Sequence, residues 1–178
     1  MIKTDYYVLF ENCAPHQDAI ERAYQLIRDN YDILEDWFET TGKSGKSFAK
    51  HFDGRTRTRF KCKKNLKMYA RGVPTGMELG GKYLENLANA RATASDDECR
   101  CLDIDLAAVI MHETCHLCWR SGERTAWSLE AWWRVKITNR LGLAGTRYCW
   151  VTEFPADGKW NIKLKDIKPK VRAAVGAS

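Results

Sequence analysis

Apolar residues three and four positions apart predict a long amphipathic helix over residues 15–40, because this spacing places them on one side of a helix. Pro15 stands at its start, where a helix tolerates proline. Residues 1–10 lack the long apolar core of a signal peptide and predict a first strand instead. The positions on the apolar side of the helix are Ile20, Ala23, Tyr24, Ile27, Tyr31, Leu34 and Phe38.

The pattern changes to alternation over residues 56–70, which indicates a strand. Its apolar positions are Phe60, Leu66, Met68 and Tyr69. Residues 72–76 contain two glycines and a proline and predict a turn, after which residues 77–81 predict a short strand. The glycines here would let a substrate backbone approach closely and pair with the strand edge. A glycine-rich hairpin without a role explains them equally well.

Two helices in succession are predicted next. Apolar residues 107–111 run directly into His112, and a polar break ending in Gly122 precedes a second helix over residues 123–137, which ends near Gly142. A turn this short makes the two helices antiparallel. We therefore expect residues 1–178 to form one α+β domain. It combines a small mixed or antiparallel sheet, the long N-terminal helix and this helical hairpin.

The first helix of the hairpin carries the sequence His-Glu-Thr-Cys-His at residues 112–116. Residues four apart stand one above the other on a helix, so the imidazoles of His112 and His116 can bind one Zn²⁺. Glu113 can then act as a base on a zinc-bound water, which predicts hydrolysis of peptide bonds. The competing interpretation is a core helix with hydrogen-bonded histidines. Packing alone gives little reason for two His and one Glu in an apolar run.

A hydrolytic zinc site needs a third protein ligand and an open position for water. In an antiparallel hairpin centred on Gly122, Glu130 lies as far after the turn as Thr114 lies before it. Glu130 is therefore expected level with the two histidines and is the predicted third ligand. Glu123 is the alternative, at the turn and about 12 Å further along the axis at about 1.5 Å per residue.

Over about residues 103–142, these features resemble the zincin metallopeptidases, and within them the gluzincin branch. The resemblance implies a catalytic Zn²⁺ bound by His112, His116 and Glu130, with Glu113 as general base and then proton shuttle. It also implies a peptide or protein substrate, and a small sheet whose edge strand pairs with that substrate in extended form.

Two other branches of the zincins fit less well. The metzincin pattern would need Gly and His where this chain has Trp119 and Gly122. The deuterolysin-like aspzincins use a downstream Asp as third ligand, and this chain has no Asp between Asp105 and Asp157. They remain a more distant relation.

Peptide hydrolysis places negative charge on the former carbonyl oxygen, so a positioned hydrogen-bond donor is expected. Tyr148, just past the second helix of the hairpin, is the predicted catalytic donor, with Arg147 as the alternative. A tyrosine in such a position more often serves packing. Tryptophans that line a specificity pocket or fill the core are Trp127, Trp132, Trp133 and Trp150.

Seven cysteines supply the main rival hypothesis. Cys99, Cys101, Cys115 or Cys118 could join the histidines in a closed, structural zinc site of a non-catalytic binding module or delivered toxin. Cys99 or Cys101 could instead cap the zinc of a latent enzyme. Glu113 distinguishes the hydrolase from the structural zinc site, because a structural site does not require a general base. Many cysteines in a chain without a recognisable signal peptide do not decide the compartment of the protein. It is either cytoplasmic or exported by a signal-independent route.

The net charge of +6 is concentrated in two stretches. Alternating cations on one strand face, and a basic C-terminal tail over about residues 160–178, are most often solvated. No nucleic-acid motif is recognisable, so nucleic acid is not an expected partner, and an inhibitory protein partner stays open. Residues 41–47 do not complete a phosphate-binding loop, since Thr40 replaces its first Gly. No apolar run reaches membrane length. The alternating cations are Arg55, Arg57, Arg59, Lys61 and Lys63.

Overall fold

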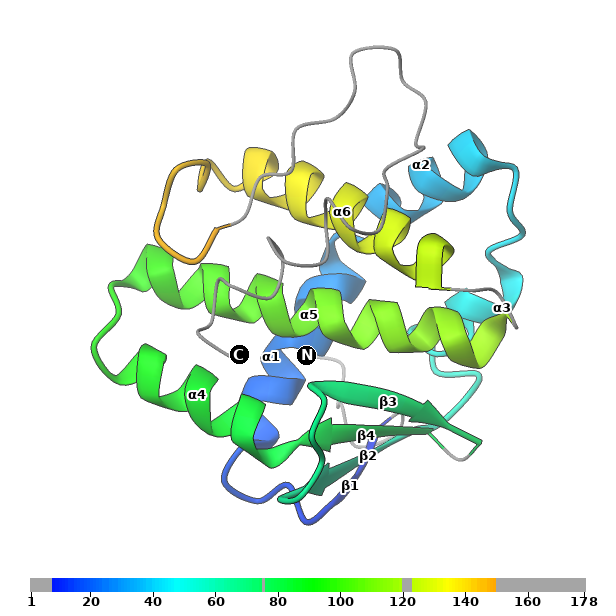
Figure 1. Cartoon of the computed structure of the whole chain (residues 1–178). Coiled ribbons are helices and arrows are strands. Elements are labelled where there is room, and N and C mark those ends of the chain that lie inside the picture. Colours follow the sequence, from blue (N-terminus) through cyan, green and yellow to red (C-terminus); the bar gives the residue numbers. More distant parts are fainter. Residues whose placement is uncertain (1–7, 75, 120–122, 150–178) are drawn as a thin grey trace.

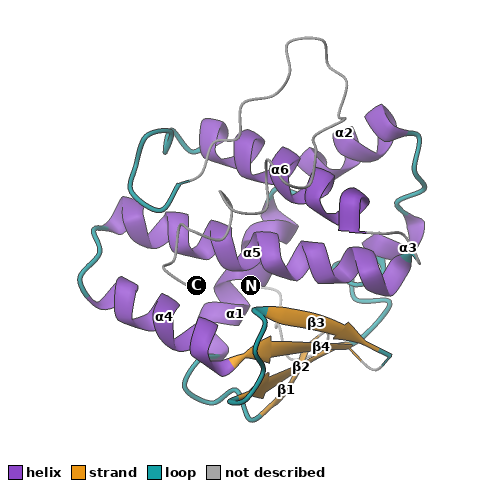
Figure 2. Ribbon diagram, in the orientation of Figure 1, coloured by secondary structure: helices purple, strands orange, loops and turns teal. Residues whose placement is uncertain are grey.

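The computed structural model describes residues 8–74, 76–119 and 123–149, which form a small sheet with helices packed on one side of it (Figure 1). Helix dominates the described chain, and the α+β prediction is confirmed (Figure 2). In chain order the elements are β1 (Val8–Glu11), α1 (Gln17–Asp29), α2 (Asp32–Thr41), α3 (Lys46–Ala49), β2 (Thr58–Lys63), β3 (Ala70–Val73), β4 (Gly76–Gly80), α4 (Gly81–Ala92), α5 (Asp96–Cys118) and α6 (Glu123–Arg140).

The single N-terminal helix predicted over residues 15–40 is wrong, because the chain breaks between α1 and α2. The Asn30 side chain donates to the Leu26 carbonyl oxygen at 3.0 Å and its backbone N–H bonds to Ile27, so it ends α1. Such side-chain bonds compete with helix continuation. The apolar spacing continues across the break, and Ile27 and Leu34 are both buried. Periodicity alone therefore could not reveal it.

The sheet has the order β1-β2-β4-β3. β2 pairs in parallel with both β1 and β4, while β3 and β4 form an antiparallel hairpin. The strand predicted over residues 56–70 is therefore two elements, β2 and the first residue of β3. The predicted strand at residues 77–81 is β4, shifted by one residue, and it lies inside the sheet. The edge strand nearest the helices is β3.

Helix α5 is the centre of the molecule, with α1, α4, α6 and β3 all packed against it (Figure 1). Ser95 and Glu98 form a capping box at its start, each satisfying a backbone N–H of the other. Its residues from Cys101 to Cys115 are almost all buried. α6 runs back along α5 as the predicted antiparallel hairpin. The motif helix is thus held on every side, which fixes the orientation of its polar side chains.

Two disulfides join distant parts of the chain. Cys13 bonds to Cys62 at β2, and Cys101 on α5 bonds to Cys149 after α6. Cys99, Cys115 and Cys118 are free. None of the helices in the described ranges combines the length and apolar character that crossing a membrane requires. The predicted first strand over residues 1–10 is described only from Val8 on, and the predicted basic tail lies outside the described residues.

Candidate active site

The two histidines of the motif lie one turn apart on α5 and face the start of α6. Their ring centroids are 5.1 Å apart. His112 is 3% exposed, whereas His116 is half-buried nearer the surface. Both belong to the last two turns of a helix whose other sides are packed. The helix therefore presents two imidazoles side by side, as the spacing predicts.

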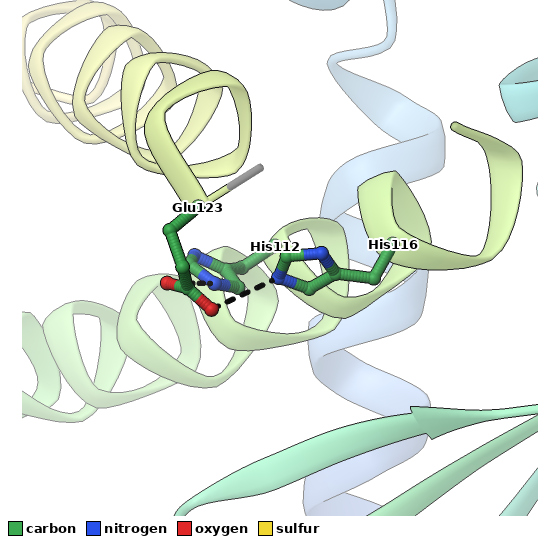
Figure 3. A group of neighbouring side chains, drawn as sticks. All are labelled: His112, His116 and Glu123. Atoms are coloured by element: carbon green, nitrogen blue, oxygen red, sulfur yellow. Dashed lines mark ion pairs between the residues drawn. The ribbon is translucent and has the colours of Figure 1, made fainter. Parts of the chain in front are cut away.

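Glu123, the first residue of α6, completes a group of three with these histidines (Figure 3). One carboxylate oxygen lies 3.4 Å from Nε2 of His112, and the other lies 3.3 Å from Nε2 of His116. All three ligand atoms fall within 4.8 Å of one another. The Trp127 indole N–H donates to the same carboxylate at 2.7 Å, and the indole ring packs against the His112 ring. Glu123 is thus held in place from within α6.

Glu130, the predicted third ligand, does not join this group. Its carboxylate accepts a hydrogen bond from Nδ1 of His112 at 3.0 Å, on the ring edge opposite Nε2. Residue counting placed Glu130 at the right level along the hairpin. It could not say which edge of the imidazole the carboxylate meets. The alternative, Glu123, is the carboxylate on the Nε2 side.

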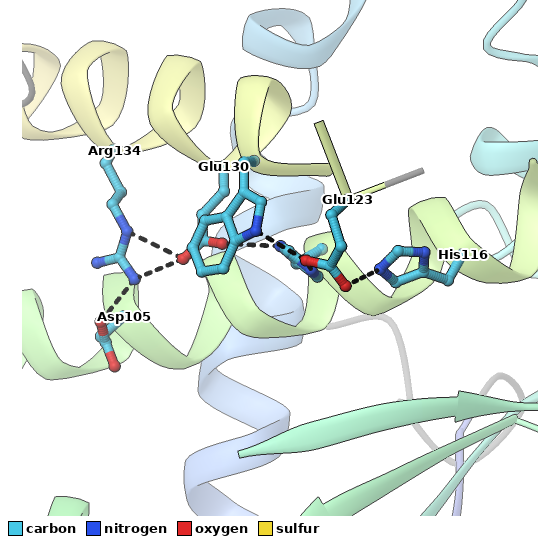
Figure 4. A network of polar contacts seen from close by, with 7 residues as sticks. Asp105, His116, Glu123, Glu130 and Arg134 are labelled. Atoms are coloured by element: carbon cyan, nitrogen blue, oxygen red, sulfur yellow. Dashed lines mark hydrogen bonds and ion pairs between the residues drawn. The ribbon is translucent and has the colours of Figure 1, made fainter. Parts of the chain in front are cut away.

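Glu130 belongs to a buried ionic network with Arg134 and Asp105 (Figure 4). Arg134, 1% exposed, donates to the Glu130 carboxylate at 2.9 Å and forms an ion pair with Asp105 at 2.6 Å. The Asp105 contact is close but lacks the alignment of a hydrogen bond. Tyr83 donates to the other Asp105 oxygen at 2.7 Å. This series of contacts holds the His112 ring in place from three helices, α4, α5 and α6. It runs from Tyr83 through Asp105, Arg134 and Glu130 to His112.

Opposing effects set the pKa values in this group. Burial lowers the pKa of His112, but its bonds to Glu123 and Glu130 outweigh burial and raise it to about 9. The bond to His112 lowers the pKa of Glu123 to about 2. Burial raises the pKa of Glu130, while His112 and Arg134 together hold it below its usual value. Without metal, the histidine therefore carries a proton between two carboxylates.

We expect the metal-free protein to lose stability as the pH rises from 6.5 to about 9. The pKa of His112 is higher in the folded chain than its ordinary value of 6.5, so its contribution is complete below pH 6.5 and disappears as the ring loses its proton. Thermal unfolding in the presence of a chelator, across this range, measures the effect. His112→Gln should flatten the profile, and an equally steep profile in that variant would contradict the assignment.

Glu113 points to the sheet side of α5 and touches the edge strand. Its carboxylate accepts a hydrogen bond from the Gly72 backbone N–H at 2.8 Å. Burial raises the pKa of Glu113, against the lowering effects of His112 and this N–H. A Cβ on Gly72 would stand 3.3 Å from Leu117, so glycine permits the close approach of β3 to α5. Glu113 is thus held between the histidines and the sheet edge.

Tyr148, the predicted oxyanion donor, lies away from this site. Its neighbour Cys149 is bonded to Cys101, eleven residues before His112 on α5 and about 16 Å away along the axis at about 1.5 Å per residue. Arg147 packs over the Tyr148 ring at 4.8 Å. The structure therefore brings neither Tyr148 nor Arg147 to the group formed by His112, His116 and Glu123. The disulfide draws this segment to the opposite end of α5.

The cysteines do not form the rival zinc site in the described part of the chain. Cys101 is in a disulfide, and the Cys99 thiol faces the backbone carbonyl oxygens of Arg91 and Ala94 at 3.9 Å. Cys115 is buried. The described cluster of possible metal donors consists of His112, His116 and Glu123, without a cysteine.

The tryptophans mostly fill the core. Trp127, Trp132 and Trp133 are buried, and Trp150 lies outside the described residues. Sequence reasoning missed the contacts of Gly72, Asp105 and Arg134 altogether. An arginine four residues after Glu130 on an otherwise apolar helix side was the available signal for a buried pair. Comparison of the chain with protein-family models, curated proteins and solved structures finds no match.

Proposed function

We propose that this chain is a zinc-dependent metallopeptidase whose metal is held by His112, His116 and Glu123. The observation that carries the proposal is the spacing of the three donor atoms. Ligands about 2.0–2.1 Å from a tetrahedral Zn²⁺ stand about 3.3 Å from one another. One carboxylate oxygen of Glu123 lies 3.4 Å from Nε2 of His112 and the other lies 3.3 Å from Nε2 of His116, and one donor atom from each of the three residues lies within 4.8 Å of the other two. Two imidazoles and one carboxylate also form a donor set suited to zinc.

The second contact of His112 supports the same proposal. Metal-binding histidines usually donate their other ring N–H to a carboxylate, which fixes the ring and raises its basicity. Glu130 accepts that bond, and Arg134 neutralises Glu130. A structural core histidine would not need a carboxylate on each ring nitrogen. This arrangement therefore favours a metal ligand over a packed histidine.

Bound Zn²⁺ would act as a Lewis acid, lowering the pKa of water and polarising a peptide carbonyl. The protein supplies the proton transfers. Glu113, buried beside the histidines, takes the proton of the attacking water while the oxygen bonds to the carbonyl carbon. The C–N bond then breaks, and Glu113 delivers the proton to the amine that leaves. The products are a carboxylic acid and an amine, and Glu113 returns to its carboxylate form.

Zinc affinity tests which glutamate is the ligand. Glu130→Gln is expected to lower the zinc affinity about 10- to 100-fold. Glu123→Gln removes the charge of a ligand and should lower the zinc affinity further. Wild type should hold one zinc per chain and cleave an unfolded protein such as casein. Competition titration against a chelating dye measures the affinities, with His16→Ala as a control histidine outside the site.

A greater loss in Glu130→Gln than in Glu123→Gln would return the ligand role to Glu130. Zinc that binds to wild type without any cleavage of casein would count against the peptidase and favour a structural ion.

A further inference from the structure

The outer face of the sheet carries one row of charges that runs across all four strands. Glu11 of β1 is aligned with Lys61 of β2, Lys61 with Glu78 of β4, and Glu78 with Arg71 of β3. The signs therefore alternate from one strand to the next. Lys61 pairs with Glu11 at 2.5 Å, and Arg71 pairs with Glu78. Aligned opposite charges on neighbouring strands stabilise a sheet.

Arg71 is the last member of this row, because β3 is the edge strand. Its side chain is 49% exposed. Glu78, its one acidic neighbour in the row, also pairs with Lys63 at 2.7 Å. Two cations thus share one carboxylate at the sheet edge. A residue placed beyond Arg71 would meet a positive charge that is only partly neutralised.

Among the described residues no further strand pairs with the outer edge of β3, and this edge lies beside the candidate active site. The N–H of Gly72, next to Arg71, points away from β4 and bonds to Glu113. A peptide whose carbonyl lies next to Glu113 therefore lies next to β3 as well. An unpaired strand edge is a template for an extended peptide, which then becomes an additional strand of the sheet. The side chain aligned with Arg71 would be the fifth member of the charge row.

Resting on the proposed peptidase function, we infer that the enzyme selects acidic peptide segments and places an Asp or Glu beside Arg71, close to the bond that is cleaved. The surrounding chain supports this choice. Residues 43–71 contain eleven Lys or Arg and a single Asp, Asp53. This stretch covers α3, β2 and the start of β3. It attracts acidic chains toward the edge at long range.

A peptide suits this surface better than a nucleic acid. Glu78 stands between Lys61 and Arg71, and Glu11 ends the row at β1. Nucleic acid carries a negative charge about every 3.4 Å along each strand, so some of its phosphates would lie over these carboxylates. A peptide with one or two acids separated by neutral residues meets Arg71 and avoids them. The alternating row therefore favours a peptide whose negative charges are separated by neutral residues.

Cleavage of a mixture of unstructured peptides by the zinc-loaded protein tests the inference. Wild type should cleave sites with Asp or Glu within three residues about two- to fivefold more often than matched Asn or Gln sites, the range expected for an opposite-charge pair across strands. Arg71→Gln should remove the preference, and Arg71→Glu should reverse it toward Lys and Arg. Arg57→Glu changes the net charge equally but lies off the row, so it should keep the wild-type preference.

Binding to the zinc-loaded Glu113→Gln variant gives a second readout that does not require cleavage. A Glu-containing peptide should bind about two- to fivefold more tightly than its Gln counterpart, and Arg71→Gln added to this variant should abolish the difference. Cleavage without an acidic preference, or a preference lost equally in Arg57→Glu, would overturn the inference and leave the peptidase intact. A DNA duplex that competes better than the acidic peptide would overturn it as well. An Arg71-dependent preference in binding, with no cleavage of any peptide, would instead remove the proposed function and keep the docking site.

Discussion

Glu113→Gln is expected to reduce peptide hydrolysis by about 10²- to 10⁴-fold, the usual contribution of a general base. Glutamine keeps the size of the side chain and still accepts the hydrogen bond from Gly72, which is 2.8 Å away in the wild type. It cannot take a proton from water at neutral pH. Zinc content should stay at one per chain, because Glu113 lies outside the donor group of His112, His116 and Glu123.

The measurement is the rate of cleavage of a quenched peptide, together with metal analysis of the same preparation. Glu85→Gln is the matched control, since Glu85 is exposed on α4. That variant should cleave at the wild-type rate. Glu113→Gln that retains more than a tenth of wild-type activity would remove Glu113 from the mechanism. Loss of zinc together with activity would show instead that Glu113 stabilises the metal site.

Arg134→Met is expected to lower the free energy of unfolding by about 3–5 kcal/mol, as for other buried ion pairs that lose one partner. Arg134 is the one cation that contacts both Glu130 and Asp105 in the described chain, and both carboxylates are 2% exposed. Methionine fills much of the same space and leaves the two charges facing each other in the core. His112 would then be held less firmly, so zinc affinity should fall too.

Denaturant unfolding with a chelator present separates this stability effect from metal binding. Arg140→Met is the control on the same helix, because Arg140 pairs with the exposed Asp32. An exposed pair contributes at most about 1 kcal/mol. Equal losses in the two variants would contradict the role of the network. The double variant Glu130→Gln with Arg134→Met should lose less than the sum of the single changes, because the residues share one network.

The parts of the site that depend on local spacing were predictable from the sequence. His112 and His116 lie on one helix side because four residues make about one turn, and the polar break before Glu123 predicts the antiparallel hairpin. The choice between Glu123 and Glu130 was not predictable. It depends on which ring nitrogen each carboxylate approaches, and this follows from the rotation of α6 about its axis.

Contacts between distant segments also could not be predicted from the sequence. Gly72 meets Glu113 because β3, and not β4, is the edge strand, and this order follows from the parallel pairing of β2 with β4. Tyr148 is drawn away by the disulfide between Cys101 and Cys149, a pairing that seven cysteines leave undetermined. The break at Asn30 lies within an unbroken apolar pattern. In each case a tertiary contact decided the outcome.

The most direct test of the central claim is a titration of the metal-free protein with zinc, with the rate of peptide cleavage recorded at each addition. The account predicts a rate that rises in proportion to zinc and becomes constant at one equivalent, with Glu123→Gln requiring much higher zinc to reach a plateau. Stoichiometric zinc binding to His112 and His116 with no cleavage at any point of the titration would contradict the account.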